Sequence, residues 1–135
     1  MEPERTAPQE EVPGFLRNDK TFSFHVIRKI VRGATIDRVT GGDPALIPAF
    51  IESTRALEAG EAKAIVGDCG LISSYQEDIA KSVSVPVASS SSLLIPLAYH
   101  MLGKSKKVGI ITAESKKLSE RHFLAEVEVA MMFQS

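Results

Sequence analysis

The chain has 135 residues and a formal net charge of −1, and its 44% apolar and 24% charged residues are typical of a soluble globular protein. This length suits one domain with its own core, and the near-neutral charge excludes any electrostatic reason to expect nucleic acid or a membrane as a partner. The single cysteine, Cys69, excludes an internal disulfide and is compatible with a reducing cytoplasm. Residues 92–102, the longest strongly apolar stretch, are too short to span a bilayer, and no signal-peptide pattern precedes them. We therefore expect a soluble cytoplasmic protein.

The first part of the chain is expected to form a tail, a strand and a helix. Residues 1–20 are polar and interrupted by proline and glycine, which predicts a flexible N-terminal tail. Residues 21–31 are rich in β-branched and aromatic side chains in alternation, which predicts a strand. The pair Asp43-Pro44 is typical of a helix start, because aspartate caps exposed amides and proline fits the first helical position. Gly60 is then expected to end this helix in the left-handed conformation.

Strands and helices alternate over the rest of the chain. Short apolar runs predict strands at residues 64–66, 83–88 and 107–112. Apolar residues at helical spacing predict helices at residues 72–82, 93–102 and 118–130. A polar turn is expected at residues 113–117, before the last helix. Such alternation predicts a parallel sheet with helices on both faces. We therefore expect an α/β fold of about four parallel strands, in a single domain over residues 21–135.

Cys69 lies where a predicted strand is followed by a helix, which is the carboxyl edge of a parallel sheet, where ligands bind. The same edge is expected to carry Gly70, the serine run 89–92 and Thr112, each following a strand. A thiol, hydroxyls and amides at helix N-termini make a site for a small carboxylate. The other interpretation of Cys69 is a small, buried apolar residue.

Other chemistries find less support in the residues. A cysteine nucleophile requires a histidine partner, and the chain offers His25, His100 and His122. The last two are expected inside helices and directed away from the carboxyl edge, so a cysteine hydrolase is the least favoured hypothesis. The sequence has no spaced cluster of metal ligands and no G-x-S-x-G motif, so we expect no metal and no serine hydrolase.

Three stretches resemble the aspartate/glutamate/hydantoin racemase family. They are Ile-Val-Gly-Asp-Cys-Gly-Leu-Ile at 65–72, Ser-Val-Pro-Val-Ala-Ser-Ser-Ser-Ser-Leu-Leu-Ile-Pro-Leu at 84–97 and Lys-Lys-Val-Gly-Ile-Ile-Thr-Ala at 106–113. The resemblance implies one flavodoxin-like half of a two-domain, cofactor-independent racemase acting on an amino acid or a related small carboxylate. In that family two cysteines flank the substrate's α-carbon, because inversion needs proton loss and gain on opposite sides.

The resemblance also implies roles for individual residues. Cys69 matches the family's first catalytic cysteine, and Thr112 matches a hydroxyl residue that helps to hold the substrate. Gly70, Ser90 and Ser91 are expected on the substrate side of the same pocket. The chain resembles the first half only and has no second cysteine, so it implies an incomplete racemase.

A second hypothesis comes from a different class of protein. Half of a two-domain fold leaves a sheet edge and one side of the pocket exposed, which favours association with another chain. The chain would then be a non-catalytic α/β binding or oligomerisation module, with a homo-oligomer as the expected assembly.

Overall fold

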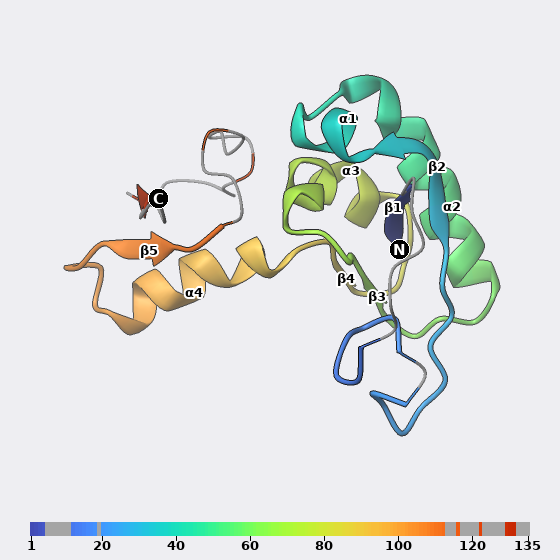
Figure 1. The fold of residues 1–135 in the computed structure, drawn as a ribbon, viewed down its shortest axis with the longest axis horizontal. Helices are drawn as coiled ribbons and strands as arrows, with labels where there is room; N and C mark the ends of the chain where they lie inside the picture. The colour runs from blue at the N-terminus through green and yellow to red at the C-terminus, as the bar shows by residue number, and fades with distance from the viewer. Residues whose placement is uncertain (5–11, 19, 113–115, 117–121, 123–128, 132–135) are drawn as a thin grey trace.

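The computed structural model describes residues 1–4, 12–18, 20–112, 116, 122 and 129–131 and shows a mixed α/β chain (Figure 1). Its strands are β1 (Glu2–Glu4), β2 (Ile30–Thr35), β3 (Ile65–Val66), β4 (Val87–Ala88), β5 (Val108–Ile110) and β6 (Val129–Met131). Its α-helices are α1 (Ile36–Thr40), α2 (Ile47–Ala59), α3 (Gln76–Lys81) and α4 (Leu94–Met101). Short 3-10 helices precede three of them: η1 (Pro44–Leu46), η2 (Gly70–Tyr75) and η3 (Ser91–Leu93). No described helix is long and apolar enough to cross a membrane.

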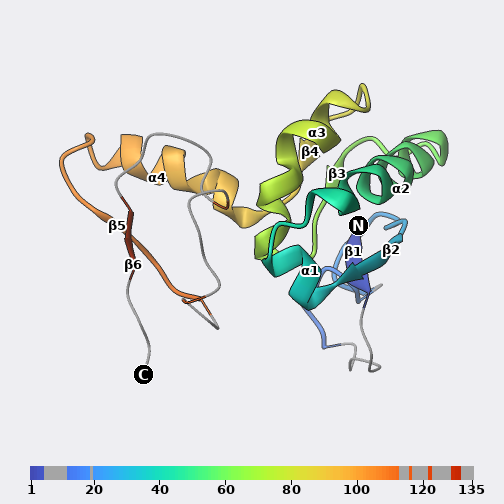
Figure 2. The ribbon, with the colours of Figure 1, turned by 90° about the horizontal axis from the view of Figure 1, so that it is seen from above.

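The strands of the described residues form three parallel pairs, β1–β2, β3–β4 and β5–β6. The expected parallel pairing is therefore confirmed, whereas one continuous sheet is not. Met1 joins the first two pairs, since its nitrogen donates to the Val66 carbonyl (3.0 Å) and its carbonyl accepts from the Asp68 amide (3.0 Å). The β5–β6 pair lies alongside α4 and apart from β3 and β4 in both views (Figures 1 and 2). The chain thus carries one group of four strands and a separate pair.

The prediction of a flexible tail over residues 1–20 is wrong for residues 1–4. Glu2 and Pro3 pair with Ile30 and Val31 in β2, and the side chain of Pro3 is fully buried. The Glu2 carboxylate also lies 3.2 Å from the Arg28 guanidinium. This polar segment contains a proline and has no strand pattern in its sequence. It forms a strand because it pairs with β2, 28 residues away along the chain (Glu2↔Ile30).

The strand predicted at residues 21–31 is also wrong, because the strand begins only at Ile30. The three residues of β1 pair only with residues of β2, so residues 21–29 have no strand partner there and no regular structure. The alternating Phe22 and Phe24 stack on each other instead, with ring centroids 5.0 Å apart. Phe24 remains 66% exposed, so the alternation reflects a local aromatic pair and not one buried face of a sheet.

The helix start at Asp43 is confirmed, since its carboxylate accepts from the Ala45 amide at 2.9 Å. The predicted left-handed stop at Gly60 is wrong, because Gly60 has φ −82° and Glu61 has φ +65°. The left-handed turn comes one residue later, where the Ala62 amide donates to the Leu57 carbonyl at 3.1 Å.

The later elements are shorter than predicted. The strand expected at 83–88 is reduced to β4, and the helix expected at 72–82 is divided into η2 and α3. The helix expected at 93–102 is confirmed by α4. Most of the turn 113–117 and of the last helix 118–130 lies outside the described residues, although Val129 and Ala130 belong to a strand, β6.

The buried core lies between the first group of strands and the helices α1, α2 and α3. Phe50 of α2 stacks on Tyr75 at 4.5 Å between ring centroids, and both are almost fully buried. The remaining large members are Val31, Val39, Leu46, Leu57, Ile65, Ile72 and Ile79. Helix α4 contributes no buried residue to this core.

The backbones of β3 and β4 approach each other closely at Gly67, the residue directly after β3. A Cβ atom there would lie 1.9 Å from the Ser89 carbonyl oxygen, whereas a Cβ atom at Gly70 would have no atom within 4 Å. We expect Gly67→Ala to lower the free energy of unfolding by at least about 1–3 kcal/mol, because backbone must move to relieve the overlap. Gly70→Ala is the matched control and should change it by less than about 0.5 kcal/mol. Urea denaturation of both variants measures the difference, and equal stabilities would contradict the described approach of the two strands.

Candidate functional site

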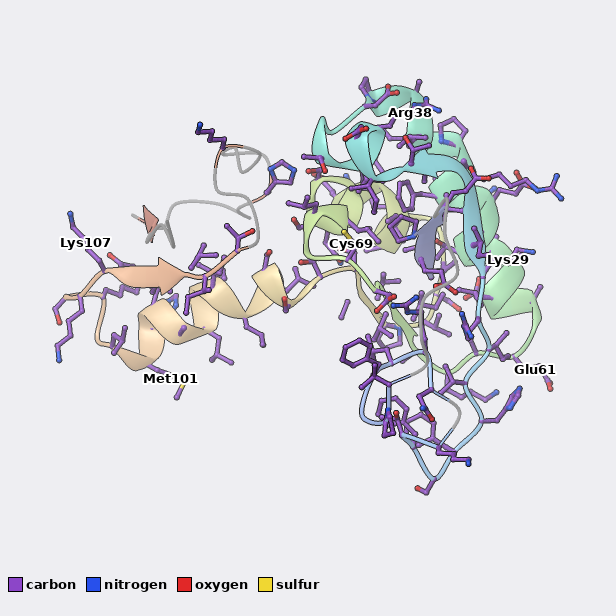
Figure 3. All side chains as sticks on the ribbon, in the orientation of Figure 1. Lys29, Arg38, Glu61, Cys69, Met101 and Lys107 are labelled. Atoms are coloured by element: carbon purple, nitrogen blue, oxygen red, sulfur yellow. The ribbon has the colours of Figure 1, made fainter. Side chains whose placement is uncertain are left out.

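Cys69 follows β3 and occupies the position just before η2, as the sequence predicts. Its backbone is extended (φ −154°, ψ 128°), and its carbonyl accepts the Ile72 amide at 3.2 Å to open the 3-10 turn. The side chain is half-buried and packs against the edge of the core (Figure 3). Both interpretations of this thiol, a reactive group and a small apolar side chain, are therefore compatible with its burial.

The carbonyl of Gly70, next to Cys69, is the acceptor for several serine hydroxyls. Ser90 Oγ donates to it at 2.6 Å and Ser92 Oγ at 3.4 Å. Ser73 Oγ lies 3.2 Å from it and 3.0 Å from the His122 carbonyl, so these two acceptors compete for its single proton. The bonds from Ser90 and Ser92 tie the loop after β3 to the loop after β4. The structure thus brings Cys69, Gly70 and Ser90 together, as expected for two neighbouring strand ends.

The hydroxyl of Ser90 is already engaged inside this loop. Its side chain is buried, and besides donating to Gly70 it accepts from the Ser92 amide at 3.0 Å as the cap of η3. Ser91, in contrast, is exposed. The geometry therefore gives Ser90 a positioning role beside Cys69.

Thr112 is not joined to this loop by strand pairing. It follows β5, which pairs with β6 beside α4 and not with β4 (Figure 1). No hydrogen bond of the described residues joins Thr112 to Cys69, Gly70 or Ser90.

Two residues near the loop carry contacts that the sequence analysis did not identify. Gln76 binds the backbone of β4 with both ends of its amide, donating to the Val87 carbonyl at 3.0 Å and accepting from the Ser89 amide at 2.9 Å. Ser89 is fully buried and its hydroxyl has no hydrogen-bond partner within the described part of the chain. The serine run was the only sequence signal for Ser89, and nothing local marks Gln76.

Among the residues that the structure describes, no hydrogen bond joins a histidine ring to the Cys69 thiol. His25 is exposed, and His100 is exposed on α4 with Nδ1 2.8 Å from the Pro96 carbonyl oxygen. His122 is buried, and its backbone carbonyl accepts from Ser73 Oγ at 3.0 Å. In the part of the chain that the structure describes, no group of three or more potential ligands could hold a metal ion.

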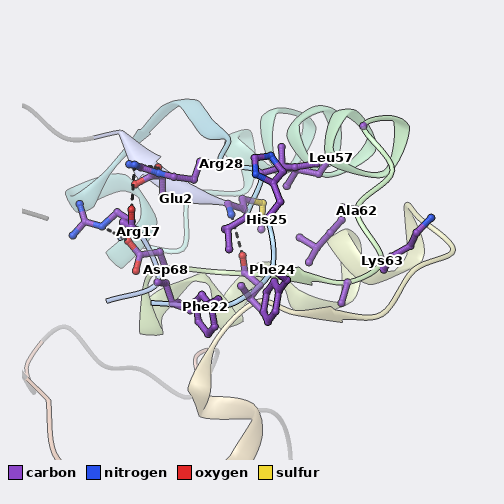
Figure 4. A pocket seen from close by; sticks show the side chains of 18 of the residues that line it. Glu2, Arg17, Phe22, Phe24, His25, Arg28, Leu57, Ala62, Lys63 and Asp68 are labelled. Carbon is purple, nitrogen blue, oxygen red and sulfur yellow. Dashed lines mark hydrogen bonds and ion pairs between the residues drawn. The ribbon is translucent and has the colours of Figure 1, made fainter. Parts of the chain in front are cut away.

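A cavity of about 790 Å³ lies beside β1 and β3, and it does not include the predicted site residues (Figure 4). Its walls come from the segment 22–28, from residues 60–66 and from the side chains of Arg17 and Asp68. Cys69, Gly70, Ser90, Ser91 and Thr112 are all absent from its lining. The loop that holds Cys69 and Gly70, called the thiol loop below, and the cavity are therefore two different places on the molecule.

Comparison with known proteins gives one match. The chain is 25% identical over 114 residues to a protein named dimethylsulfoniopropionate lyase from Durusdinium sp. clade D. The match covers 82% of this chain and 38% of that protein, so the chain spans well under half of the relative's length. No model of a protein family matches the chain, and no solved structure matches it.

The serine contacts of the thiol loop predict a difference between two neighbouring residues. Ser90→Ala removes a buried donor to the Gly70 carbonyl and the cap of η3, so we expect the free energy of unfolding to fall by about 1–3 kcal/mol. Ser91→Ala, at an exposed position one residue later, should leave it within about 0.5 kcal/mol. Urea denaturation provides the comparison. Equal effects of the two substitutions would show that the Gly70 contact does not hold the loop.

Proposed function

We propose that the chain is part of a cofactor-independent enzyme in which Cys69 removes a proton from the carbon next to a carboxylate. The observation that carries this proposal is the loop after β3, where Cys69 is held beside the loop after β4 by the hydrogen bond from Ser90 to Gly70. Gly70, the next residue, is exposed and a Cβ atom there would have no atom within 4 Å, so a ligand can approach this end of the loop. A half-buried thiol in a fixed loop is suited to proton transfer, which requires a set distance between the base and the carbon.

The same first step serves a racemase and a lyase of dimethylsulfoniopropionate. That compound is a small carboxylate with a dimethylsulfonium group on its β-carbon. When a thiolate takes an α-proton, the electron pair left on carbon forms a C=C bond and the C–S bond breaks; the products are acrylate, dimethyl sulfide and the protonated thiol. Elimination therefore needs one base, whereas racemisation needs two groups on opposite faces. Because the chain has one cysteine, β-elimination or α-proton exchange is the reaction that these residues can start.

A flavodoxin-like arrangement is the fold that we propose for the complete sheet. The bonds of Met1 to Val66 and Asp68 support the neighbour order β2, β1, β3, β4. In that order β1 and β3 flank the point where the direction of winding changes, and ligands of such sheets bind at the carboxyl ends of the strands there. Cys69 follows β3 and so lies at this edge.

Small carboxylates in D₂O test the proposed base directly. We expect the purified chain to exchange the α-protons of dimethylsulfoniopropionate or of amino acids, and to release dimethyl sulfide from the former, while Cys69→Ala loses at least about 100-fold of the rate, the lower end of a general base's contribution. ¹H NMR follows exchange and gas chromatography follows dimethyl sulfide.

Two controls make this experiment decisive. Gly70→Leu keeps the thiol and adds a large side chain at the neighbouring exposed position, so it should lower the rate by hindering the ligand while the stability of the chain is retained. Exchange that persists unchanged in Cys69→Ala would assign the base elsewhere. No reaction with any compound would favour the non-catalytic module.

The second candidate function is an oligomerisation module, and helix α4 favours it. Leu94, Leu97 and Met101 are 60%, 56% and 79% exposed, and α4 contains no Asp, Glu, Lys or Arg. Two copies could therefore pack this face without burying a charge. Static light scattering distinguishes a stable dimer from a monomer at the concentrations used for the exchange experiment.

A further inference from the structure

The cavity beside β1 and β3 has the size and the lining of a small-molecule site. Its volume of about 790 Å³ falls in the usual range for ligand pockets, about 300–1,000 Å³. Phe22, Leu57, Ala62 and Ile65 supply apolar walls from three different parts of the chain. A ligand enclosed there would remove apolar surface from water on several sides.

Four charged side chains of the cavity, those of Glu2, Arg17, Arg28 and Asp68, lie together at one end, and Lys63 lies at the opposite end (Figure 4). Arg28 pairs with Glu2 at 3.2 Å, and Arg17 pairs with Asp68 at 3.0 Å. The two ion pairs are adjacent, since Arg28 Nη1 also donates to the Arg17 carbonyl at 3.4 Å. The cavity therefore has two ion pairs at one end, a largely apolar body and the Lys63 side chain at the other end.

The two ion pairs differ in which side chain is the more exposed, because in the second pair Arg17 is 14% and Asp68 is 23% exposed. The side chain of Glu2 is 7% exposed, while that of Arg28 is 40% exposed, so the guanidinium covers the carboxylate. Arg28 is the most exposed of the four charged side chains at this end of the cavity. The surrounding segment has the same sign, because residues 17–32 contain five Lys or Arg and a single Asp. An anion is therefore the complementary head group.

We propose that this cavity binds a small amphiphilic carboxylate, with its apolar chain between Phe22, Leu57 and Ala62 and its carboxylate at Arg28. Guanidinium binds carboxylate through charge-assisted hydrogen bonds and keeps its charge at every relevant pH, so the head group is selected by chemistry as well as by position. The site is separate from Cys69 and does not require the reaction proposed for that residue.

Isothermal titration calorimetry with decanoate, kept below the concentration at which it forms micelles, measures the proposed binding. We expect decanoate to bind at one site per chain, and decyltrimethylammonium, with the same tail and the opposite charge, to bind at least about tenfold more weakly. Arg28→Gln should weaken decanoate about tenfold, and Lys29→Gln, at the next residue and outside the cavity lining, should not.

Two further variants keep the test independent of folding. Arg28→Gln leaves the buried Glu2 carboxylate without its guanidinium, so the double variant Glu2→Gln/Arg28→Gln removes both charges, and it should also bind decanoate more weakly than the wild type. Ala64→Trp, at an exposed position of the cavity lining, should abolish binding with the melting temperature retained. Recovery of wild-type affinity in the double variant, equal binding of the two amphiphiles, or no binding of decanoate at all would overturn the proposal.

Discussion

The backbones of β3 and β4 approach so closely at Gly67 that the Ser89 carbonyl oxygen occupies the place where a Cβ atom would stand. This contact sets the relative position of the two loops that follow. Two residues beyond it lies Cys69, and the next carbonyl, that of Gly70, collects the hydroxyls of Ser90 and Ser92. Since the bonds from Ser90 and Ser92 depend on the spacing of the two strands, the position of the thiol depends on Gly67. A loop held in this way can present a side chain at a fixed distance from a ligand.

The Gln76 side chain binds backbone groups at the edge of β4 with which a further strand would otherwise pair. The amides of Ile65 and Gly67 bind Pro86 and Ala88, so Val87 and Ser89 face the opposite edge of β4, where the Gln76 amide satisfies both. In a larger parallel sheet that edge would receive β5, which here pairs with β6. Such capping of an exposed edge is a common protection against pairing with other chains.

Sequence patterns predicted the features that depend on neighbouring residues and missed those that depend on distant ones. The cap at Asp43, the helix α4 and the place of Cys69 between a strand and a helix are local, and all three are found. The strand β1 and the edge contact of Gln76 need partners far along the chain, so no local pattern indicates them. Cys69, Gly70 and Ser90 were predicted together because they follow neighbouring strands. Thr112 was expected at the same edge, whereas its strand β5 pairs with β6. The Ser90 hydroxyl was expected on the substrate side, and only the structure shows that it holds the loop itself.

The central claim is that a small carboxylate binds beside Cys69, and the rate of alkylation of this thiol tests it most directly. Cys69 is the only cysteine of the chain, so mass spectrometry assigns every cysteine adduct of iodoacetamide to it. The account predicts that dimethylsulfoniopropionate or a small amino acid slows the alkylation in a saturable way, and that the corresponding neutral amide does so far less. An alkylation rate that no carboxylate changes, measured on the folded chain, would contradict it.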